Sequence, residues 1–127
     1  MRAQRQLPLT AVLGWLLCTA AHGADLHGDP VHGKALYESR CTSCHSLDHS
    51  RIGPAHRGVF GRHAARVSDF DYSPALKRSN VTWNARTLDR WLTNPEAFIP
   101  GQKMGYSVPE PQDRADVIAF LAGPDAH

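Results

Sequence analysis

The stretch "ESRCTSCHSLD" (residues 38–48) contains two cysteines, Cys41 and Cys44, with His45 directly after the second. A Cys-x-x-Cys pair has three common uses: a redox dithiol, half of a zinc site or, when histidine follows directly, the attachment site of a c-type haem. Each use requires different features elsewhere in the chain, so the remaining sequence must decide between them.

Features outside the motif argue against the first two uses. A thioredoxin-like dithiol follows a strand within a βαβ pattern, which this sequence lacks, and a disulfide across so short a loop would stabilise little. A zinc site needs a second pair of ligands at comparable spacing. The later histidines show no paired spacing and are predicted to be surface residues: His49, His56, His63 and His127. Haem attachment is therefore the favoured use.

The first 23 residues have the composition of an export signal. Two arginines precede a mostly apolar stretch, and the small residues Ala21 and Gly23 suit the −3 and −1 positions of a cleavage site. The stretch is too short for a typical spanning helix, although an uncleaved N-terminal anchor is the alternative. Leu17 before Cys18 argues against a lipid-modified cysteine. We expect cleavage near Gly23/Ala24 and a periplasmic protein, a location that suits haem attachment.

Residues 24–127 are expected to form a single domain, because their length suits one small core. Loss of the two signal arginines leaves 12 basic residues against 12 acidic ones. This balance argues against a nucleic-acid partner. The sequence after the signal also contains no second apolar segment that would suggest a membrane span.

The cysteine motif is predicted to end a helix that begins after Asp29, because Asp caps a first turn and Pro30 suits its first position. Val31, Ala35 and Leu36 recur along this helix at helical spacing. Residues 46–73 show no sustained period and are predicted to form a loop. So long a loop in a small domain usually serves a function.

Three further short helices are predicted. One follows Ser73 and Pro74, a second follows Asn84 and stops at Pro95, and a third spans residues 112–123. The apolar faces of the last two helices are Leu88, Trp91 and Leu92, and Val117, Phe120 and Leu121. Because about half of the chain is irregular, these helices form a thin core, and a haem would fill the gap.

A haem in the gap between these helices would be held by further residues. Two cysteines on one helical turn can reach both vinyl groups of a porphyrin edge, and His45 then provides an axial ligand. The second axial ligand must be soft or neutral, and Met104 is the single methionine after the signal. It lies in the Pro-Gly-rich segment "IPGQKMGY", where a core-filling methionine is not expected. The predicted iron ligands are therefore His45 and Met104.

Over nearly all of residues 28–122 the chain resembles the class I cytochromes c. The segments that carry the resemblance are "GDPVHGKALYESRCTSCHSL", "GPAHRGVFGR", "YSPALKRSNVTW", "TLDRWLTNPEAFIPGQKM" and "DRADVIAFLAG". The resemblance implies an all-α fold with three to five short helices wrapped around one covalently bound haem c. It also implies that the first and last helices cross, with Gly33 and Tyr37 meeting Ala119 and Phe120.

The resemblance implies roles for four more residues. The Pro54 carbonyl would accept the Nδ1 hydrogen of the ligand imidazole, and the haem propionates would bind Arg62, Tyr72 and Trp83. Three positions depart from the family pattern of Thr, Asn and Tyr: Gln102, Leu76 and Trp91. These departures change the hydrogen bonds and water positions that set the reduction potential.

The implied function is one-electron transfer without catalysis, by a monomer that moves between redox proteins. The donor would be a dehydrogenase or a cytochrome complex, and the acceptor an oxidase or a peroxidase. The alternatives are the haem c subunit of a periplasmic oxidoreductase complex and a haem peroxidase, which requires Met104 to leave the iron. Mitochondrial-type relatives steer partners with lysines at the haem edge, but this chain keeps Arg40 and Lys103 and places Glu96 and Glu110 where lysines are expected. We therefore expect weak steering.

Overall fold

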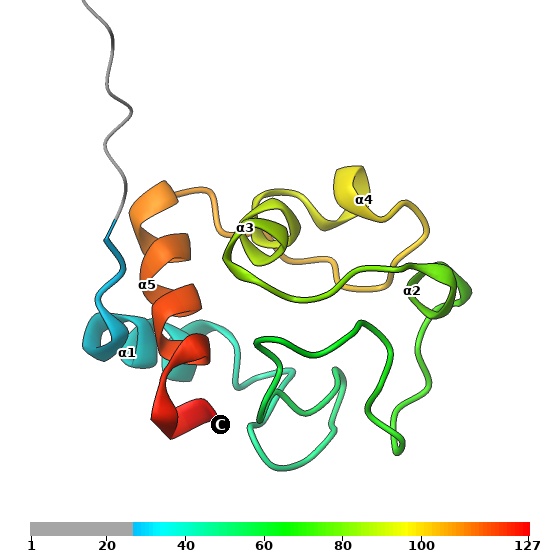
Figure 1. Cartoon of the computed structure of the whole chain (residues 1–127), viewed down its shortest axis with the longest axis horizontal. Coiled ribbons are helices and arrows are strands. Elements are labelled where there is room, and N and C mark those ends of the chain that lie inside the picture. The colour runs from blue at the N-terminus through cyan, green and yellow to red at the C-terminus, as the bar shows by residue number, and fades with distance from the viewer. Residues whose placement is uncertain (1–26) are drawn as a thin grey trace, which may run out of the picture.

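The computed structural model describes residues 27–127, which form five α-helices and one 3₁₀ helix joined by irregular segments (Figure 1). The predicted signal and its cleavage site lie outside the described residues. The helices are α1 (Pro30–Arg40), α2 (Pro74–Arg78), α3 (Ala85–Thr93), α4 (Pro95–Phe98), α5 (Pro111–Ala122) and the 3₁₀ helix η1 (Pro124–Ala126). Residues 27–127 contain one isolated bridge, between His63 and Thr82, and no β-strand. The predicted all-α fold is confirmed.

The first helix begins as its sequence predicts. The Asp29 carboxylate accepts hydrogen bonds from the backbone N–H groups of Val31 at 2.9 Å and His32 at 3.3 Å, and Pro30 occupies the first turn. These bonds satisfy donors that have no partner within the helix. The cap thereby fixes the residue at which α1 begins, and the cysteine motif follows at the other end of this helix.

The buried face of α1 differs from the apolar spacing seen in the sequence. Val31 is 79 % exposed and Ala35 is also exposed, whereas Gly33, Leu36 and Tyr37 are buried. From hydrophobicity alone, Val31 would be expected on the buried face of α1. The helix that packs against α1, however, approaches this face too closely to leave room for a side chain. The smallest residue therefore faces the neighbouring helix.

That neighbour is α5, which crosses α1 with the two backbones in contact (Figure 1). A Cβ atom added to Gly33 would lie 1.9 Å from the carbonyl oxygen of Asp116, and one added to Gly28 would lie 2.8 Å from the Ala119 Cβ. Gly33 thus meets Asp116, and Ala119, which the family resemblance placed opposite Gly33, meets Gly28 instead. The crossing is as implied, but the residue nearest to Gly33 is Asp116 and not Ala119.

Aromatic packing continues the crossing toward the centre of the molecule. The rings of Tyr37 and Phe120 lie with their centroids 5.2 Å apart, in agreement with the contact that the resemblance implied. The apolar residues predicted for the last helix, Val117, Phe120 and Leu121, are all buried. They join the buried side chains of α3 in one core cluster.

A buried carboxylate closes one side of the crossing. Asp116, which is 2 % exposed, accepts hydrogen bonds from His32 Nδ1 at 2.7 Å, from the Asp29 amide at 2.8 Å and from Gln112 Nε2 at 2.8 Å. Burial by itself raises the pKa of Asp116, but these hydrogen bonds outweigh it and lower the pKa. The bond to Asp116 in turn raises the pKa of His32.

We expect this pair to make the free energy of unfolding depend on pH. His32, whose pKa is raised by folding, adds stability at low pH that is lost as pH rises through the raised value. Asp116, whose pKa is lowered, adds stability that is lost as pH falls through the lowered value. Urea unfolding from about pH 5 to pH 9 should show a decline on the alkaline side that His32→Gln removes and the exposed-site variant His49→Gln retains. An unchanged alkaline decline in His32→Gln would contradict this role.

The third helix begins with a reciprocal pair of hydrogen bonds. The Asn84 side chain accepts from the Thr87 amide at 3.0 Å, and Thr87 Oγ1 accepts from the Asn84 amide at 2.8 Å. Its predicted apolar face is buried: Leu88, Trp91 and Leu92. Pro95 ends α3 as predicted but also begins α4, because Asn94 caps the Ala97 amide at 3.0 Å.

Arg114 of α5 fixes the segment between α4 and α5. This arginine is only 9 % exposed, and its guanidinium donates to the Asp89 carboxylate at 2.7 Å. It also donates to the carbonyls of Val108 at 2.9 Å and Pro109 at 2.8 Å. The segment that contains Met104 is therefore anchored at its end to both α3 and α5.

The predicted loop, residues 46–73, is irregular but well connected. Three backbone hydrogen bonds of 2.8–2.9 Å join residues 53–57 to residues 44–47, which are the end of the cysteine motif and the two residues after it. On the outer side, the Gly58 amide donates to the Ala126 carbonyl of η1 at 2.7 Å. No helix within residues 27–127 has the length and apolar character needed to cross a bilayer.

Candidate functional site

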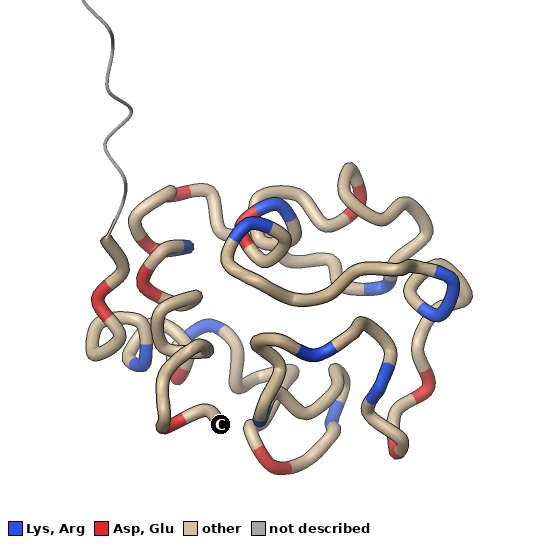
Figure 2. Tube along the Cα trace, in the orientation of Figure 1, with Lys and Arg blue, Asp and Glu red and all other residues tan. Residues whose placement is uncertain are grey.

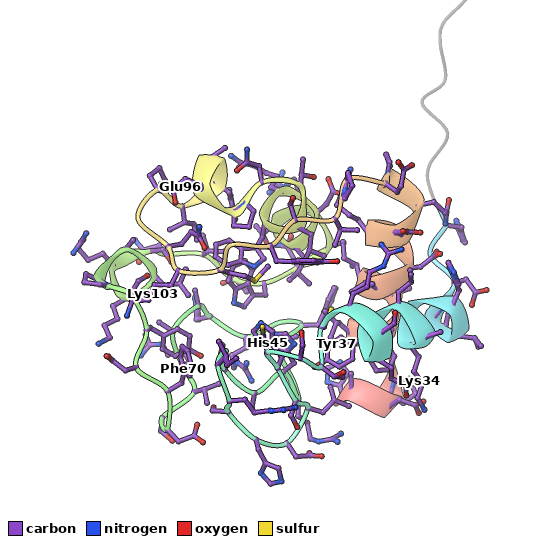
Figure 3. All side chains as sticks on the ribbon, turned by 180° about the vertical axis from the view of Figure 1, so that it is seen from behind. Lys34, Tyr37, His45, Phe70, Glu96 and Lys103 are labelled. Carbon is purple, nitrogen blue, oxygen red and sulfur yellow. The ribbon has the colours of Figure 1, made fainter. Side chains whose placement is uncertain are left out.

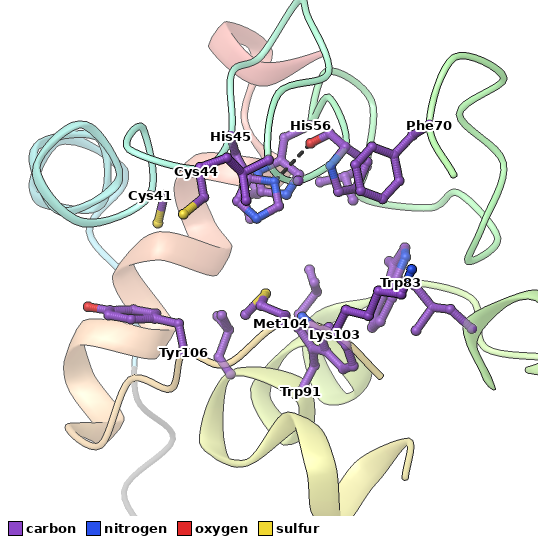
Figure 4. A pocket seen from close by; sticks show the side chains of 18 of the residues that line it. Cys41, Cys44, His45, His56, Phe70, Trp83, Trp91, Lys103, Met104 and Tyr106 are labelled. Atoms are coloured by element: carbon purple, nitrogen blue, oxygen red, sulfur yellow. Dashed lines mark hydrogen bonds between the residues drawn. The ribbon is translucent and has the colours of Figure 1, made fainter. Parts of the chain in front are cut away.

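The loop and the α3–α5 half of the molecule enclose a cavity of about 450 Å³ (Figure 4). Its walls are mostly apolar, with Trp83 and Trp91 on one side. Cys41, Cys44 and His45 lie along the opposite wall (Figure 4). The two cysteines and the histidine of the motif therefore line one apolar cavity.

His45 presents one free ring nitrogen. Its Nδ1 lies 2.8 Å from the Pro54 carbonyl oxygen, and because a carbonyl only accepts, Nδ1 carries the hydrogen and Nε2 is left free to bind a metal. Burial lowers the pKa of His45, against the opposing effect of the Pro54 hydrogen bond, so the ring is neutral near pH 7. A Cβ atom on Gly53 would lie 2.2 Å from His45 Cε1, so the ring requires glycine at that position.

The cysteines lie on the turn that ends α1. The Cys41 amide donates to the Tyr37 carbonyl at 2.9 Å, and the amides of Cys44 and His45 donate back to the Cys41 carbonyl at 3.1 and 2.8 Å. Burial raises the pKa of Cys41 to about 11, which disfavours the thiolate that dithiol chemistry requires. Among residues 27–127 these side chains also join no cluster of three or more potential metal ligands. The raised pKa of Cys41 agrees with the choice of haem attachment over a redox dithiol.

Met104 lies on the far side of the cavity from His45, with its sulfur in the cavity (Figure 4). Its backbone N–H donates to the Gln102 side-chain oxygen, and the Gln102 amide donates to Glu96 at 3.2 Å. Trp91 lines the cavity on the same side. The segment thus presents one sulfur atom across the cavity from the free imidazole nitrogen.

The three residues implied for propionate binding also line the cavity. The Arg62 guanidinium donates to two backbone carbonyls of residues 55–57, at 3.0 and 2.8 Å. The Tyr72 hydroxyl accepts a hydrogen bond from a backbone amide at 3.3 Å, and Trp83 packs against Trp91 with ring centroids 5.4 Å apart. These contacts hold the side chains at the wall, and their binding to propionates stays a prediction.

His56 is a residue whose position was predicted wrongly. Expected at the surface, it stacks instead on His45, with ring centroids 3.9 Å apart and an angle of 21° between the planes. Its Nδ1 lies 3.0 Å from the Tyr37 hydroxyl oxygen. Burial lowers the pKa of His56 well below its ordinary value, and the charges of His45 and Arg62 lower it further. Its place two residues after Pro54 was the one sequence signal that could have brought it to attention.

Comparison with known proteins identifies the family. The sequence matches the Cytochrome c family over residues 30–123. The chain belongs to the cytochrome c family. This cytochrome c is 40 % identical over 126 residues to cytochrome c2 of Rhodomicrobium vannielii, with 96 % of each chain covered. It is 41 % identical over 98 residues to cytochrome c of Stellaria longipes, covering 74 % of this chain and 91 % of the relative.

A solved structure shows the same fold. Cytochrome cH from Methylobacterium extorquens aligns with a TM-score of 0.71 and 33 % identity, over 75 % of this chain and 98 % of the other. The family resemblance inferred from sequence is therefore confirmed.

Membership in this family defines the cofactor. The cytochrome c carries one covalently attached haem c and is a monohaem electron carrier. The residues present suit this group, since two cysteines at the family spacing, a neutral imidazole with a free nitrogen and a thioether converge on one apolar cavity.

Proposed function

We propose that the protein is a periplasmic monomer that carries single electrons, with haem c bound to Cys41 and Cys44 and with His45 and Met104 as its axial ligands. Haem c supplies one-electron exchange between ferrous and ferric iron. The observation that carries the proposal is the pairing of His45 Nε2 and the Met104 sulfur across one apolar cavity.

This ligand pair explains why the protein would transfer electrons and bind no substrate. His45 and Met104 would both hold the iron, which would leave no coordination site open for a reacting molecule. Histidine–methionine ligation and an apolar surrounding raise the reduction potential. The Pro54 carbonyl increases the basicity of the imidazole by accepting its Nδ1 hydrogen.

The mass of the purified protein tests the attachment and the processing together. We expect an intact mass equal to residues 24–127 plus one haem, with the haem resistant to extraction by acidified organic solvent. A product that retains Cys18 would contradict cleavage after Gly23, and extractable haem would contradict thioether bonds to Cys41 and Cys44.

The ferric absorption spectrum should also show the sulfur-to-iron charge-transfer band that a methionine ligand produces.

The surface around the cavity opening favours brief contacts with redox partners. Tyr106 lines the cavity and is 44 % exposed, and Ile52, which also lines it, is 77 % exposed. Apolar contact at this opening would supply short-lived binding. The partners we propose are a dehydrogenase or cytochrome complex as donor and an oxidase or peroxidase as acceptor.

Three basic residues line the cavity, Arg40, Arg62 and Lys103, and the first of them is paired. Arg40 pairs with Asp113 of α5 at 2.8 Å. Lys103 and Glu96, which are of opposite charge, lie on the same side of the molecule (Figure 3). Figure 2 shows basic and acidic residues interspersed along the trace. Such a surface gives little long-range attraction to a partner of either sign.

We therefore expect electron transfer to the native acceptor to fall less than about tenfold as salt rises from low to physiological concentration. Stopped-flow rates across a salt series would measure this dependence. A double variant with Glu96→Lys and Glu110→Lys should steepen it, because the two changes restore positive charge at the positions where relatives have lysines. A steep decline in the parent protein would show that local charges outweigh the balanced total.

A further inference from the structure

The axial imidazole is contacted on its face by a second imidazole. The rings of His45 and His56 are nearly parallel, at 21°, and their centroids lie 3.9 Å apart (Figure 4). His56 in turn is bound through Nδ1 to the Tyr37 hydroxyl at 3.0 Å. Neither His56 nor Tyr37 is a proposed iron ligand or one of the residues implied for propionate binding.

We propose that His56 is a positioning residue that fixes the orientation of the His45 ring by stacking, and that Tyr37 holds His56 in place. The inference rests on the proposed role of His45 as an axial ligand. The Pro54 hydrogen bond fixes one atom of that ring. The stacked ring opposes rotation and tilt of its plane, which a bond to one atom leaves free.

The backbone of His56 is immobilised on both sides. Its N–H donates to the Ser46 carbonyl at 2.9 Å, and its carbonyl accepts from the Val59 amide at 2.8 Å. The Arg62 guanidinium binds the carbonyls of the residues immediately before and after His56, at 3.0 and 2.8 Å. The imidazole therefore extends from a fixed point of the loop.

Tyr37 connects His56 to the crossing of α1 and α5. It lies on the buried face of α1 and packs against Phe120 of α5 at the helix crossing. Its ring also contacts the His56 ring, with centroids 5.7 Å apart and a tilt of 57°. Figure 3 shows Tyr37 between the crossing helices and His45. The chain of contacts runs from the crossing through Tyr37 and His56 to the axial ring.

Space filling alone does not explain a histidine here. Leucine would occupy a similar volume without removing polar ring nitrogens from water, which is costly when they lack partners. In this structure the Tyr37 hydroxyl supplies the partner for Nδ1, so that nitrogen is satisfied and the ring is oriented. The orientation of an axial imidazole affects its orbital overlap with the iron, and outer contacts of a ligand histidine are known means of tuning a metal site.

The test compares three variants of the ferric holoprotein by NMR and EPR. His56→Leu removes both the stacked ring and the Tyr37 partner, Tyr37→Phe removes only the hydroxyl, and His49→Leu changes an exposed histidine of the same loop as a control. The readouts are the pattern of hyperfine-shifted haem methyl resonances and the largest g value, both of which depend on the axial ring plane. We expect a clear change in His56→Leu, a smaller change in the same direction in Tyr37→Phe, and none in His49→Leu.

The outcomes separate this inference from the ligand assignment. If the spectra of the parent protein lack the signature of a methionine or a histidine ligand, the proposed ligands are wrong, whatever the variants show. A parent with that signature, and a His56→Leu spectrum no more altered than that of His49→Leu, overturns only the positioning role. If His56→Leu fails to yield holoprotein, Tyr37→Phe decides: a shifted methyl pattern supports the proposal, and an unchanged one overturns it.

Discussion

Replacing Met104 with alanine is expected to open the iron, lower the reduction potential and create peroxidase activity that the parent lacks. Loss of the thioether would remove the proposed sixth ligand, which favours ferrous iron, and axial ligation accounts for much of the roughly 0.8 V range of haem potentials. The open position would then admit peroxide. Potentiometric titration and a peroxidase assay with a chromogenic donor measure the two effects.

The matched control for this variant is Met104→Leu. Leucine has nearly the same volume but no sulfur, so it should share the lowered potential and the new activity if ligation is responsible. His45→Ala should instead prevent formation of a stable holoprotein. An unchanged sulfur-to-iron charge-transfer band in ferric Met104→Ala would show that another group binds the iron.

Replacing Gly33 with alanine should destabilise the protein by about 3 kcal/mol or more. The added Cβ would lie 1.9 Å from the Asp116 carbonyl oxygen, so the α1 and α5 backbones must separate. In an ordinary helix the same change stabilises by about 1 kcal/mol. The expected sign is therefore opposite to that of helix propensity. Urea unfolding of the ferric holoprotein measures the free energy.

Glu38→Ala provides the comparison for Gly33→Ala. Glu38 lies on the exposed side of the same helix, where alanine meets no neighbouring backbone. Its free energy of unfolding should change little. Equal stabilities for Gly33→Ala and Glu38→Ala would mean that the helices do not cross as closely as described.

The helix starts, the loop and the cofactor chemistry could be predicted from the sequence. Asp29, Ser73 and Asn84 cap their helices as expected, and Pro95 ends α3. The apolar faces of α3 and α5 were also predicted. These features depend on residues within one or two turns of each other, so their physical cause is contained in a short stretch of sequence. The cysteine motif is local in the same sense, because its function depends on spacing within one turn.

Met104 is a candidate ligand that composition and position in the sequence indicated without a structure. A single methionine in a glycine- and proline-rich segment was a candidate ligand before any distance was known. The structure adds that its sulfur faces the same cavity as His45. Arg114 anchors this segment, because its guanidinium binds Asp89 and two backbone carbonyls. This anchoring was not predictable, because those partners come from separate parts of the chain.

By itself the sequence determined four of the five α-helices, the family and the cofactor, whereas only the tertiary structure showed the short helix α4 and decided which side chains meet. Spacing suggested Val31 for the apolar face of α1, but the close approach of α5 buries Gly33 there. Composition placed His56 at the surface, but hydrogen bonds between the loop and the cysteine motif bring its ring onto His45. Both outcomes depend on segments distant in the chain or on irregular loop geometry, and neither leaves a periodic signal among the residues beside it.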